Sequence, residues 1–468
     1  MADRYQSFAN STAGKFVAGR IGIPVPTPLR RYEQGQPVLD GAALLGAAPG
    51  GRLVDHAADV LRAIGADTAL APGDEVRAAA ERAGVRTSAW SEESNGDSRF
   101  AALVYDATGI HDVEGLRELY GFFHPSIWRL ERSGRVVVLA TPPRQTDDPM
   151  EAVAQRAIEG FVRSAAKEVG SRGGTANLVH VARGAEDGIE STLRFFLSAR
   201  SAYVSGQAVH VDAGHPVTPD DWEQPLAGKA ALVTGASRGI GASIAEVLAR
   251  DGADVVCLDV PAQGDALAEV ANRIGGSTLQ LDITGDDAPE RLAEHMRERH
   301  GGVDVVVHNA GVTRDKTIGR MDSDRWDMVL SINLESPLRI NDELLRGNVL
   351  RPGGRIVGVS SVSGIAGNRG QANYATSKAG VIGMVDALAP VVAPRPATIN
   401  AVAPGFIETQ MTAAMPLATR EGGRRLNSLT QGGLPLDVAE TVAWIASPGS
   451  EGVNGNVVRV CGQALIGA

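Results

Sequence analysis

The chain of 468 residues is 43% hydrophobic and 21% charged, which is ordinary for a soluble globular protein and allows two or three domains. Its net charge of −10 and its lack of a long Lys/Arg run argue against the concentrated basic face that nucleic-acid binding needs. Its two cysteines lie in apolar runs and no CxxC or HExxH spacing occurs, so we expect a reducing compartment and no metal. The N-terminus lacks the apolar core of a signal peptide, and no run approaches the ~18 apolar residues of a membrane span. We therefore expect a cytoplasmic protein with no membrane partner.

Short β-branched runs alternate with alanine-rich segments of helical length along most of the chain. Continuous apolar strands separated by helices predict a parallel sheet covered on both faces, so we expect an α/β fold of two doubly wound domains. The stretch 212–229 is rich in Pro, Gly and Asp and has no periodicity, which is typical of a linker. We place the boundary near Trp222, giving domains 1–222 and 223–468. The strand-like runs are 135–140, 176–181, 230–235, 254–259, 304–311, 355–361, 398–405 and 456–462.

The two halves resemble each other. Gly160 and Asn177 match Gly383 and Asn400 at one offset of 223 residues, whereas the ends 205–211 and 454–460 match at 249, which indicates about 26 inserted residues after Asn400. Common ancestry is our interpretation, although unrelated α/β domains also share such patterns.

The first half lacks the chemistry of the second. The offset of 223 places Glu151 opposite Tyr374 and Gln155 opposite Lys378, and Pro49 interrupts the segment where a glycine fingerprint would stand. We therefore expect a degenerate Rossmann-like or flavodoxin-like domain that is non-catalytic and serves packing and assembly. Binding of some other ligand is the alternative.

A glycine-rich turn follows the linker. Gly235, Gly239 and Gly241 lie between a strand and a helix, where they permit a tight turn, backbone approach to a pyrophosphate and close helix–strand packing. Asp259 ends the next strand 18 residues after Gly241, near the ~20 expected of the acid that binds the adenosine ribose. A carboxylate there disfavours a 2′-phosphate, so we expect NAD(H) rather than NADP(H), although Arg238 could pair with that phosphate.

Tyr374 and Lys378 stand four residues apart in "NYATSKAG" and so share a helix face. The pair could be an ordinary surface contact. It could also be an acid catalyst and a cation that lowers its pKa, because a free tyrosine, with a pKa of about 10, is a poor acid near neutrality.

Five motifs in order, "TGASRGIG", "HNAG", "SSVSG", "YATSK" and "APGFIETQM", resemble the short-chain dehydrogenase/reductase family, and most closely its 3-oxoacyl-ACP reductase branch. The resemblance covers about residues 225–468, and the long first half looks like the high-molecular-weight form of that reductase. It implies a catalytic tetrad of Asn333, Ser361, Tyr374 and Lys378. Tyr374 would protonate the ketone oxygen and Ser361 would hydrogen-bond it. Asn333 would hold a water linking Lys378 to solvent.

The resemblance also implies further contacts. Ser363 and Gln371 would join Ser361 and Tyr374 at the substrate, with Ser363 a rival to Ser361 as the catalytic serine. His308 is a departure from the family pattern that leaves one side-chain hydrogen bond in doubt. The implied cofactor residues are Gly235, Ser237, Arg238, Gly239, Ile240, Gly241, Asp259, Asp282, Ile283, Asn309, Ala310, Gly311, Tyr374, Lys378, Pro404, Gly405, Ile407 and Thr409.

The inserted residues fall at 406–437, where the family carries its substrate lid. Its apolar residues could wrap an acyl chain, and Arg420, Arg424 and Arg425 could bind the phosphate of CoA or a carrier protein. The alternative for the arginines is a solvated helix face.

These inferences predict NADH-dependent reduction of 3-oxoacyl-CoA or 3-oxoacyl-ACP in fatty-acid metabolism. The alternatives are a 3-hydroxyacyl-CoA dehydrogenase working in the oxidative direction, and a non-enzymatic scaffold that keeps a dinucleotide site. We also expect a homodimer held through the catalytic halves, with the apolar tail 461–468 buried.

Overall fold

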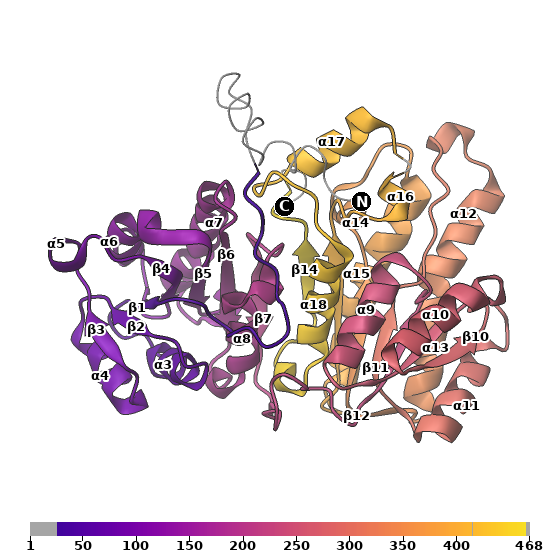
Figure 1. Ribbon diagram of the computed structural model, residues 1–468, viewed down its shortest axis with the longest axis horizontal. Helices are drawn as coiled ribbons and strands as arrows, with labels where there is room; N and C mark the ends of the chain where they lie inside the picture. Colours follow the sequence, from indigo (N-terminus) through magenta and orange to yellow (C-terminus); the bar gives the residue numbers. More distant parts are fainter. Residues whose placement is uncertain (1–25, 414, 465–468) are drawn as a thin grey trace. The chain divides into compact units, whose positions relative to one another are not determined.

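The computed structural model describes residues 26–413 and 415–464 and contains two parallel seven-stranded sheets (Figure 1). Contacts divide these residues into two compact units, each built on one sheet. The first unit holds residues 26–214, 415–432 and 462–464, and the second holds 215–413 and 433–461. The predicted boundary near Trp222 stays a prediction. The apolar tail beyond residue 464 lies outside the described residues.

The first sheet has the strand order β3-β2-β1-β4-β5-β6-β7, with every pair parallel. Its strands are β1 (Ala43–Ala47), β2 (Thr68–Leu70), β3 (Thr87–Ala89), β4 (Phe100–Asp106), β5 (Leu130–Ala140), β6 (Thr175–Val181) and β7 (Ala208–Val211). The helices are α3 (Val54–Ala63), α4 (Asp74–Ala83), α5 (Glu92–Asn95), α6 (Arg117–Ser126), α7 (Pro149–Gly170), α8 (Glu190–Leu197) and α17 (Leu417–Arg425).

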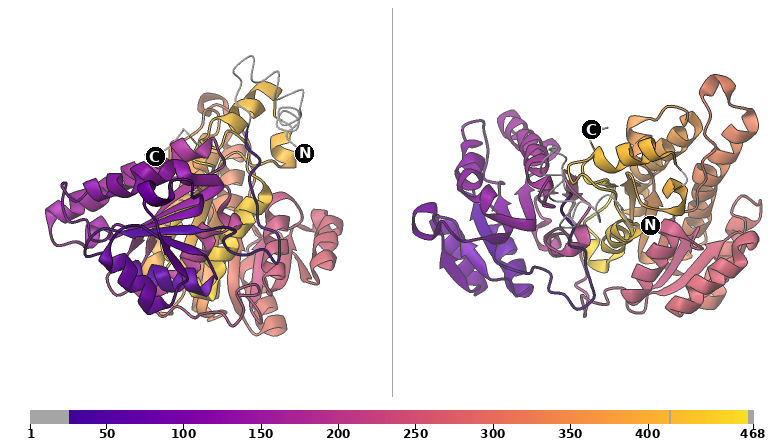
Figure 2. Two further views of the ribbon diagram at one scale, coloured as in Figure 1. Left: turned by 60° about the vertical axis from the view of Figure 1, so that its left-hand side comes forward. Right: turned by 45° about the horizontal axis from the view of Figure 1, so that its top comes forward.

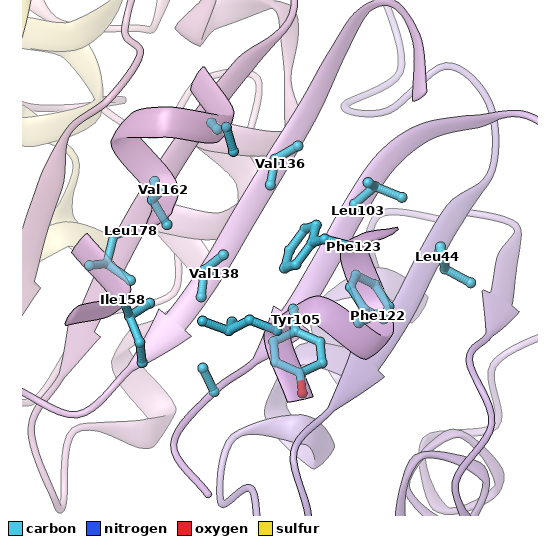
Figure 3. Close-up of a cluster of buried hydrophobic side chains, with 14 of the residues drawn as sticks. Leu44, Leu103, Tyr105, Phe122, Phe123, Val136, Val138, Ile158, Val162 and Leu178 are labelled. Carbon is cyan, nitrogen blue, oxygen red and sulfur yellow. The ribbon is translucent and has the colours of Figure 1, made fainter. Parts of the chain in front are cut away.

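A core of apolar side chains joins α6 and α7 to the first sheet (Figure 3). Phe122 and Phe123 of α6 surround Tyr105 of β4, with ring centroids 4.7 and 5.7 Å away. The long helix α7 begins where sequence signals predict a start: Asp148 caps it by accepting a hydrogen bond from Met150 N, and proline follows at the first position.

The second sheet repeats this topology in the order β10-β9-β8-β11-β12-β13-β14, again entirely parallel. Its strands are β8 (Ala230–Thr234), β9 (Asp254–Asp259), β10 (Ser277–Gln280), β11 (Val303–His308), β12 (Leu350–Val359), β13 (Thr398–Pro404) and β14 (Val457–Val460). The helices are α9 (Gly239–Arg250), α10 (Gly264–Ile274), α11 (Ala288–His300), α12 (Ser323–Leu330), α13 (Ser336–Arg346), α14 (Val362–Ala366), α15 (Ala372–Val392), α16 (Gln410–Ala413) and α18 (Pro435–Ala446).

Helices line both faces of the second sheet (Figure 2). Apolar residues of α11, α13 and α15 form one core with the strands, while α9 contacts α10 and α18. Because α10 and α11 end at left-handed glycines, Gly275 and Gly301, the chain turns sharply back into the next strand. The predicted α/β fold of two doubly wound domains is confirmed.

One interior hydrogen bond occurs in equivalent positions within each unit. Asn177 Nδ2 donates to Val204 O at 3.0 Å, and Asn400 Nδ2 donates to Val453 O at 2.7 Å. These pairs are related by the two offsets found in the sequence, 223 and 249 residues. A shared buried contact at both offsets supports the interpretation that the halves arose from one ancestor.

One helix, α15, is long and apolar enough to cross a membrane by length and composition, contrary to the expectation that no run comes close. It contacts β12 and β13, and its Val381, Met384 and Val385 belong to the core of the second unit. These contacts make it a core helix of an α/β domain.

Candidate active site and dinucleotide groove

The glycine turn after β8 has the conformation its sequence predicts. Gly235 and Gly239 have φ values of 68° and 61°, which favour glycine. A Cβ on Gly241 would lie 2.1 Å from Gly235 O, so α9 can approach the turn only because residue 241 has no side chain. A Cβ on Gly239 would meet nothing within 4 Å, so the backbone there is open. The turn and the N-terminus of α9, including Ile240, therefore fit the pyrophosphate of a dinucleotide.

The end of β11 braces this turn. Asn309 Nδ2 donates to Thr234 O at 3.0 Å and to Gly235 O at 3.1 Å. Thr234 Oγ1 accepts from the backbone N–H groups of Asn309 and Ala310 at 3.1 and 3.0 Å. The "NAG" residues thus hold the glycine turn in place. Gly311 lies beyond them, where a Cβ would be 3.4 Å from Lys378 Nζ.

Asp259 lies beside the turn at the end of β9. Its carboxylate accepts hydrogen bonds from Ser237 N at 3.2 Å and Val260 N at 2.9 Å. Arg238 is exposed at the start of α9. A negative group is therefore held where the ribose of a dinucleotide would bind.

The predicted adenine contacts differ in character. Ile283 is buried at 5% exposure, whereas Asp282 is exposed and accepts two hydrogen bonds from Thr284. The acid therefore shapes its own turn, and the apolar neighbour faces the interior.

Tyr374 and Lys378 lie on α15 with their side chains close together. Lys378 Nζ is 5.7 Å from the centroid of the Tyr374 ring and donates to Val359 O at 2.8 Å. Ser361 begins the short helix α14, where its hydroxyl accepts from Ser363 N at 3.1 Å, and it also hydrogen-bonds Tyr374. Gly364 lets α14 pack on α15, since a Cβ there would lie 2.6 Å from the Lys378 carbonyl carbon.

Burial governs the ionisation of both groups. It raises the pKa of Tyr374 above the ordinary value, opposed by the hydrogen bond from Ser361 and reinforced by the charge of Asp315. It lowers the pKa of Lys378 from 10.5 to about 8. Without a dinucleotide, desolvation thus raises the pKa of Tyr374, and the predicted lowering by Lys378 together with an oxidised nicotinamide stays a prediction. At neutral pH the phenol keeps its proton and can donate it.

Asn333 is buried in a π-helical turn, Ser331–Glu335, between α12 and α13. Its Oδ1 accepts from Val312 N at 2.9 Å, while Nδ2 donates to Val312 O at 3.0 Å and to Ser377 Oγ at 3.1 Å. The side chain thus ties the loop after β11 to the helix that carries Tyr374. Its role in holding a water stays a prediction.

The residues predicted to contact the substrate form a chain of hydrogen bonds that includes Asp315, a residue with no sequence signal. Ser363 Oγ donates to Gln371 Oε1 at 3.3 Å, and Gln371 Nε2 donates to Asp315 Oδ2 at 2.9 Å. Asp315 lies seven residues after His308 in the loop after β11, and no spacing rule marks it. It sets the position of Gln371 and contributes to the pKa of Tyr374.

The contacts of His308 account for its presence where the family pattern differs. Its Nε2 lies 2.8 Å from Asn341 Oδ1 on α13, and burial lowers its pKa to about 4. It is therefore a neutral interior residue that joins β11 to α13.

The loop after β13 holds the predicted nicotinamide contacts. Gly405, which follows Pro404, donates its N–H to Val460 O at 3.0 Å, and a Cβ on it would lie 2.6 Å from Cys461 Cβ. Ile407 is buried at 3% exposure, and the hydroxyl of Thr409 lies 3.4 Å from that of Thr412. These contacts shape the loop from within the second unit.

Two of the arginines predicted to bind phosphate form ion pairs and hydrogen bonds within the chain instead. Arg424 is 3% exposed and paired with Glu421, and Arg425 also pairs with Glu421 at 3.3 Å while donating to Thr430 O at 2.8 Å. Arg424 therefore fits neither prediction, a phosphate-binding cluster or a solvated helix face, because its charge is buried and paired with Glu421 inside the first unit. Arg420 is half-buried.

In the first unit, the residues that match the glycine turn of the second unit make close contacts with one another. Asp106, at the end of β4, accepts from Leu53 N at 2.7 Å and from Thr108 Oγ1 at 2.7 Å, and a Cβ on Gly109 would lie 2.2 Å from Pro49 O. The guanidinium of Arg52 contacts Val181 O and Glu186, at the strand end that matches Pro404. Side chains and loop backbone thus pack together here.

Glu151 and Gln155, the counterparts of Tyr374 and Lys378, also form an ion pair and hydrogen bonds of their own. Gln155 accepts from Thr141 N at 2.8 Å and donates to the carbonyls of Ala107 and Ile110, while Glu151 pairs with Arg183 at 3.5 Å. An amide and a carboxylate in these positions support the prediction that the first half is non-catalytic.

Among the described residues, no group of three or more His, Cys, Asp or Glu side chains could hold a metal ion.

The catalytic half has many relatives. The family model described as "Enoyl-(Acyl carrier protein) reductase" matches residues 235–462. The chain is similar to proteins named 3-oxoacyl-[acyl-carrier-protein] reductase FabG: 41% identical over 237 residues to that of Vibrio cholerae, and 44% over 240 residues to that of Pseudomonas aeruginosa. Each alignment covers 97% of the relative and 51% of this chain. The Escherichia coli protein of that name is 40% identical over 235 residues, covering 96% of it.

The fold and site define a dinucleotide-dependent oxidoreductase. The chain belongs to the short-chain dehydrogenase/reductase family, and within that family it is similar to the 3-oxoacyl-ACP reductases.

Proposed function

We propose that this enzyme reduces 3-oxoacyl thioesters, carried by ACP or CoA, to 3-hydroxyacyl thioesters in fatty-acid biosynthesis. The observation that carries the proposal is a protonated Tyr374 held by Ser361 and placed next to a buried Lys378, in a chain that over about half its length is 41–44% identical to proteins named for that reaction. The tetrad and cofactor residues keep their predicted roles as part of this proposal.

The chemistry follows from the protonation of these groups. A reduced nicotinamide, when bound, would supply a hydride to the ketone carbon, and negative charge would then develop on the ketone oxygen. Tyr374 gives its phenolic proton to that oxygen, and Ser361 stabilises the oxygen by hydrogen bonding. The ammonium of Lys378, held by Val359 O, then lies close enough to stabilise the phenolate that remains.

NADH is the proposed reductant. The Asp259 carboxylate is fixed by two backbone N–H groups beside the glycine turn, and a dianionic 2′-phosphate would face it at short range. Arg238 is exposed, so solvent screens its charge and it offsets that repulsion only in part.

The relatives named for the reductive reaction favour reduction over the oxidative 3-hydroxyacyl-CoA dehydrogenase alternative. A Tyr374 phenol with a raised pKa is consistent with the proton donor that reduction needs.

Steady-state kinetics with acetoacetyl-CoA and a long-chain analogue, each with NADH and NADPH, tests the proposal. We expect turnover with a higher kcat/KM for NADH. Turnover only of 3-hydroxyacyl-CoA with NAD⁺ would favour the oxidative alternative, and dinucleotide binding without any turnover would favour the scaffold.

We also propose a cytoplasmic homodimer. Helix α15 is apolar along its length yet only a third buried, and Val391 is 58% exposed on it. Covering this face with a second copy would remove apolar surface from water. Light scattering should give about twice 48.7 kDa, and Val391→Lys should shift the chain toward monomer. The matched change Val153→Lys, on the exposed face of α7 at 54% exposure, should leave the dimer intact, and a monomeric wild type would refute the assembly.

A further inference from the structure

The inserted segment leaves and rejoins the second unit at one place. Ile407 and Gly433 form a parallel bridge, with Glu408 N donating to Gly433 O at 2.8 Å and Gly433 N donating to Phe406 O at 3.0 Å. Both ends are therefore pinned directly after β13, beside the loop proposed to contact the nicotinamide. Between them the chain runs out to residues 415–432, which we call the lid segment and which belong to the first unit.

Tyr203 of the first half holds the lid segment. Its hydroxyl, on a side chain with 0% exposure, donates to Gln431 O at 2.8 Å and accepts from Asn427 Nδ2 at 3.3 Å. Asn427 in turn donates to the carbonyls of Arg424 and Gln431 at 3.0 and 2.8 Å. One buried phenol thus stabilises the whole turn that ends α17.

Further contacts reinforce this anchor. Gly170, the last residue of α7, packs so closely on the lid segment that a Cβ on it would lie 2.5 Å from Ser428 O. Gln431 Nε2 donates to Thr27 O at 2.8 Å. Ser428 N also donates to Gly462 O at 3.0 Å, and Gly462 N donates to Tyr203 O at 2.9 Å. Gly462 and the lid segment are therefore held by the same part of the first unit.

We propose that the first half is the anchor of the substrate lid, with Tyr203 as the positioning residue. This inference rests on the proposed function, because it assigns the lid segment to the acyl thioester. An anchored lid loses less conformational freedom when substrate binds, so the anchor lowers the KM for the thioester. It leaves the proton donor and the glycine turn untouched, so kcat and dinucleotide affinity do not depend on it.

Trypsin reports on the anchor without any substrate, since α17 contains Arg420, Arg424 and Arg425. Tyr203→Phe removes the hydroxyl and should speed cleavage in α17 by about 3- to 10-fold, the worth of one buried hydrogen bond. The matched control is Tyr105→Phe, which alters another buried tyrosine of the first unit, at 1% exposure in the core under α6. It should leave the cleavage rate unchanged.

Gly170→Ala tests the same contact by pushing the lid segment away, and Gly160→Ala is its control in the same helix, because a Cβ there meets nothing within 4 Å. We expect Gly170→Ala and Tyr203→Phe each to raise the KM for acetoacetyl-CoA about 3- to 10-fold with kcat and NADH affinity unchanged. Equal cleavage rates and equal KM in the variants and their controls would overturn the anchor. Faster cleavage in an enzyme inactive toward every thioester would refute the proposed function and leave the anchoring contact standing.

Discussion

Replacing Lys378 by methionine should change how the stability of the second unit depends on pH. Burial lowers the pKa of Lys378 from 10.5 to about 8, which corresponds to about 3 kcal/mol because one pKa unit is worth about 1.4 kcal/mol. Between pH 8 and 10.5 the unfolded chain binds more protons at this residue than the folded chain, so folding becomes more favourable as the pH rises. Below pH 8 the full penalty of burying the charge is present. Methionine removes the penalty, but it leaves Val359 O without its donor at a cost of about 1–3 kcal/mol, which offsets part of the gain at pH 7.

The difference between wild type and Lys378→Met isolates this residue from other titrations. Hydrogen exchange of β12 and β13, followed by mass spectrometry at pH 7 and 10 without dinucleotide, reports the free energy of opening in the second unit. Wild type should gain about 2–3 kcal/mol relative to the variant over this interval. Lys316→Met, at an exposed lysine, should behave like wild type. An identical pH dependence in wild type and Lys378→Met would refute the reasoning that this cation is buried without a compensating charge.

Three further outcomes follow from the site. Tyr374→Phe should lower kcat about 10²–10⁴-fold, as expected for loss of a general acid, while NADH still binds in a fluorescence titration; near-normal turnover would reject the mechanism. Asp259→Ala should relax the preference for NADH in kcat/KM as Arg238 gains a 2′-phosphate to pair with, and a wild type that already prefers NADPH would contradict this. Gly241→Ala should destabilise the second unit by about 1–3 kcal/mol in a denaturant titration and weaken NADH binding, because its Cβ would overlap Gly235 O. The control Gly319→Ala should have neither effect, because a Cβ there meets nothing within 4 Å.

The sequence predicted the doubly wound fold well because its evidence is repetitive. Buried parallel strands are continuous apolar runs, and the sequence offsets of 223 and 249 residues match Asn177 to Asn400 and the end 205–211 to 454–460. The glycine turn was equally readable, since Gly235 and Gly239 have positive φ values that favour glycine and Gly241 has no room for a side chain.

Other features depend on burial and long-range contact, which a local pattern does not encode. The arginines of 420–425 resemble a basic cluster in sequence, yet Arg424 is buried against Glu421 once α17 packs in the first unit. The spacing of Tyr374 and Lys378 placed them on one face correctly, but the direction of the tyrosine pKa shift depends on desolvation. The anchor at Tyr203 joins residues 228 positions apart, and no motif marks either partner.

The most direct test of hydride transfer to the 3-oxo carbon uses NADH carrying deuterium at both C4 positions. The full chain is incubated with acetoacetyl-CoA and this NADH, and the product is examined by mass spectrometry. The account predicts 3-hydroxybutyryl-CoA with one deuterium at C3, formed by wild type and slowed about 10²–10⁴-fold in Tyr374→Phe. Oxidation of NADH without deuterium in the thioester, or equal labelling by the two proteins, would contradict it.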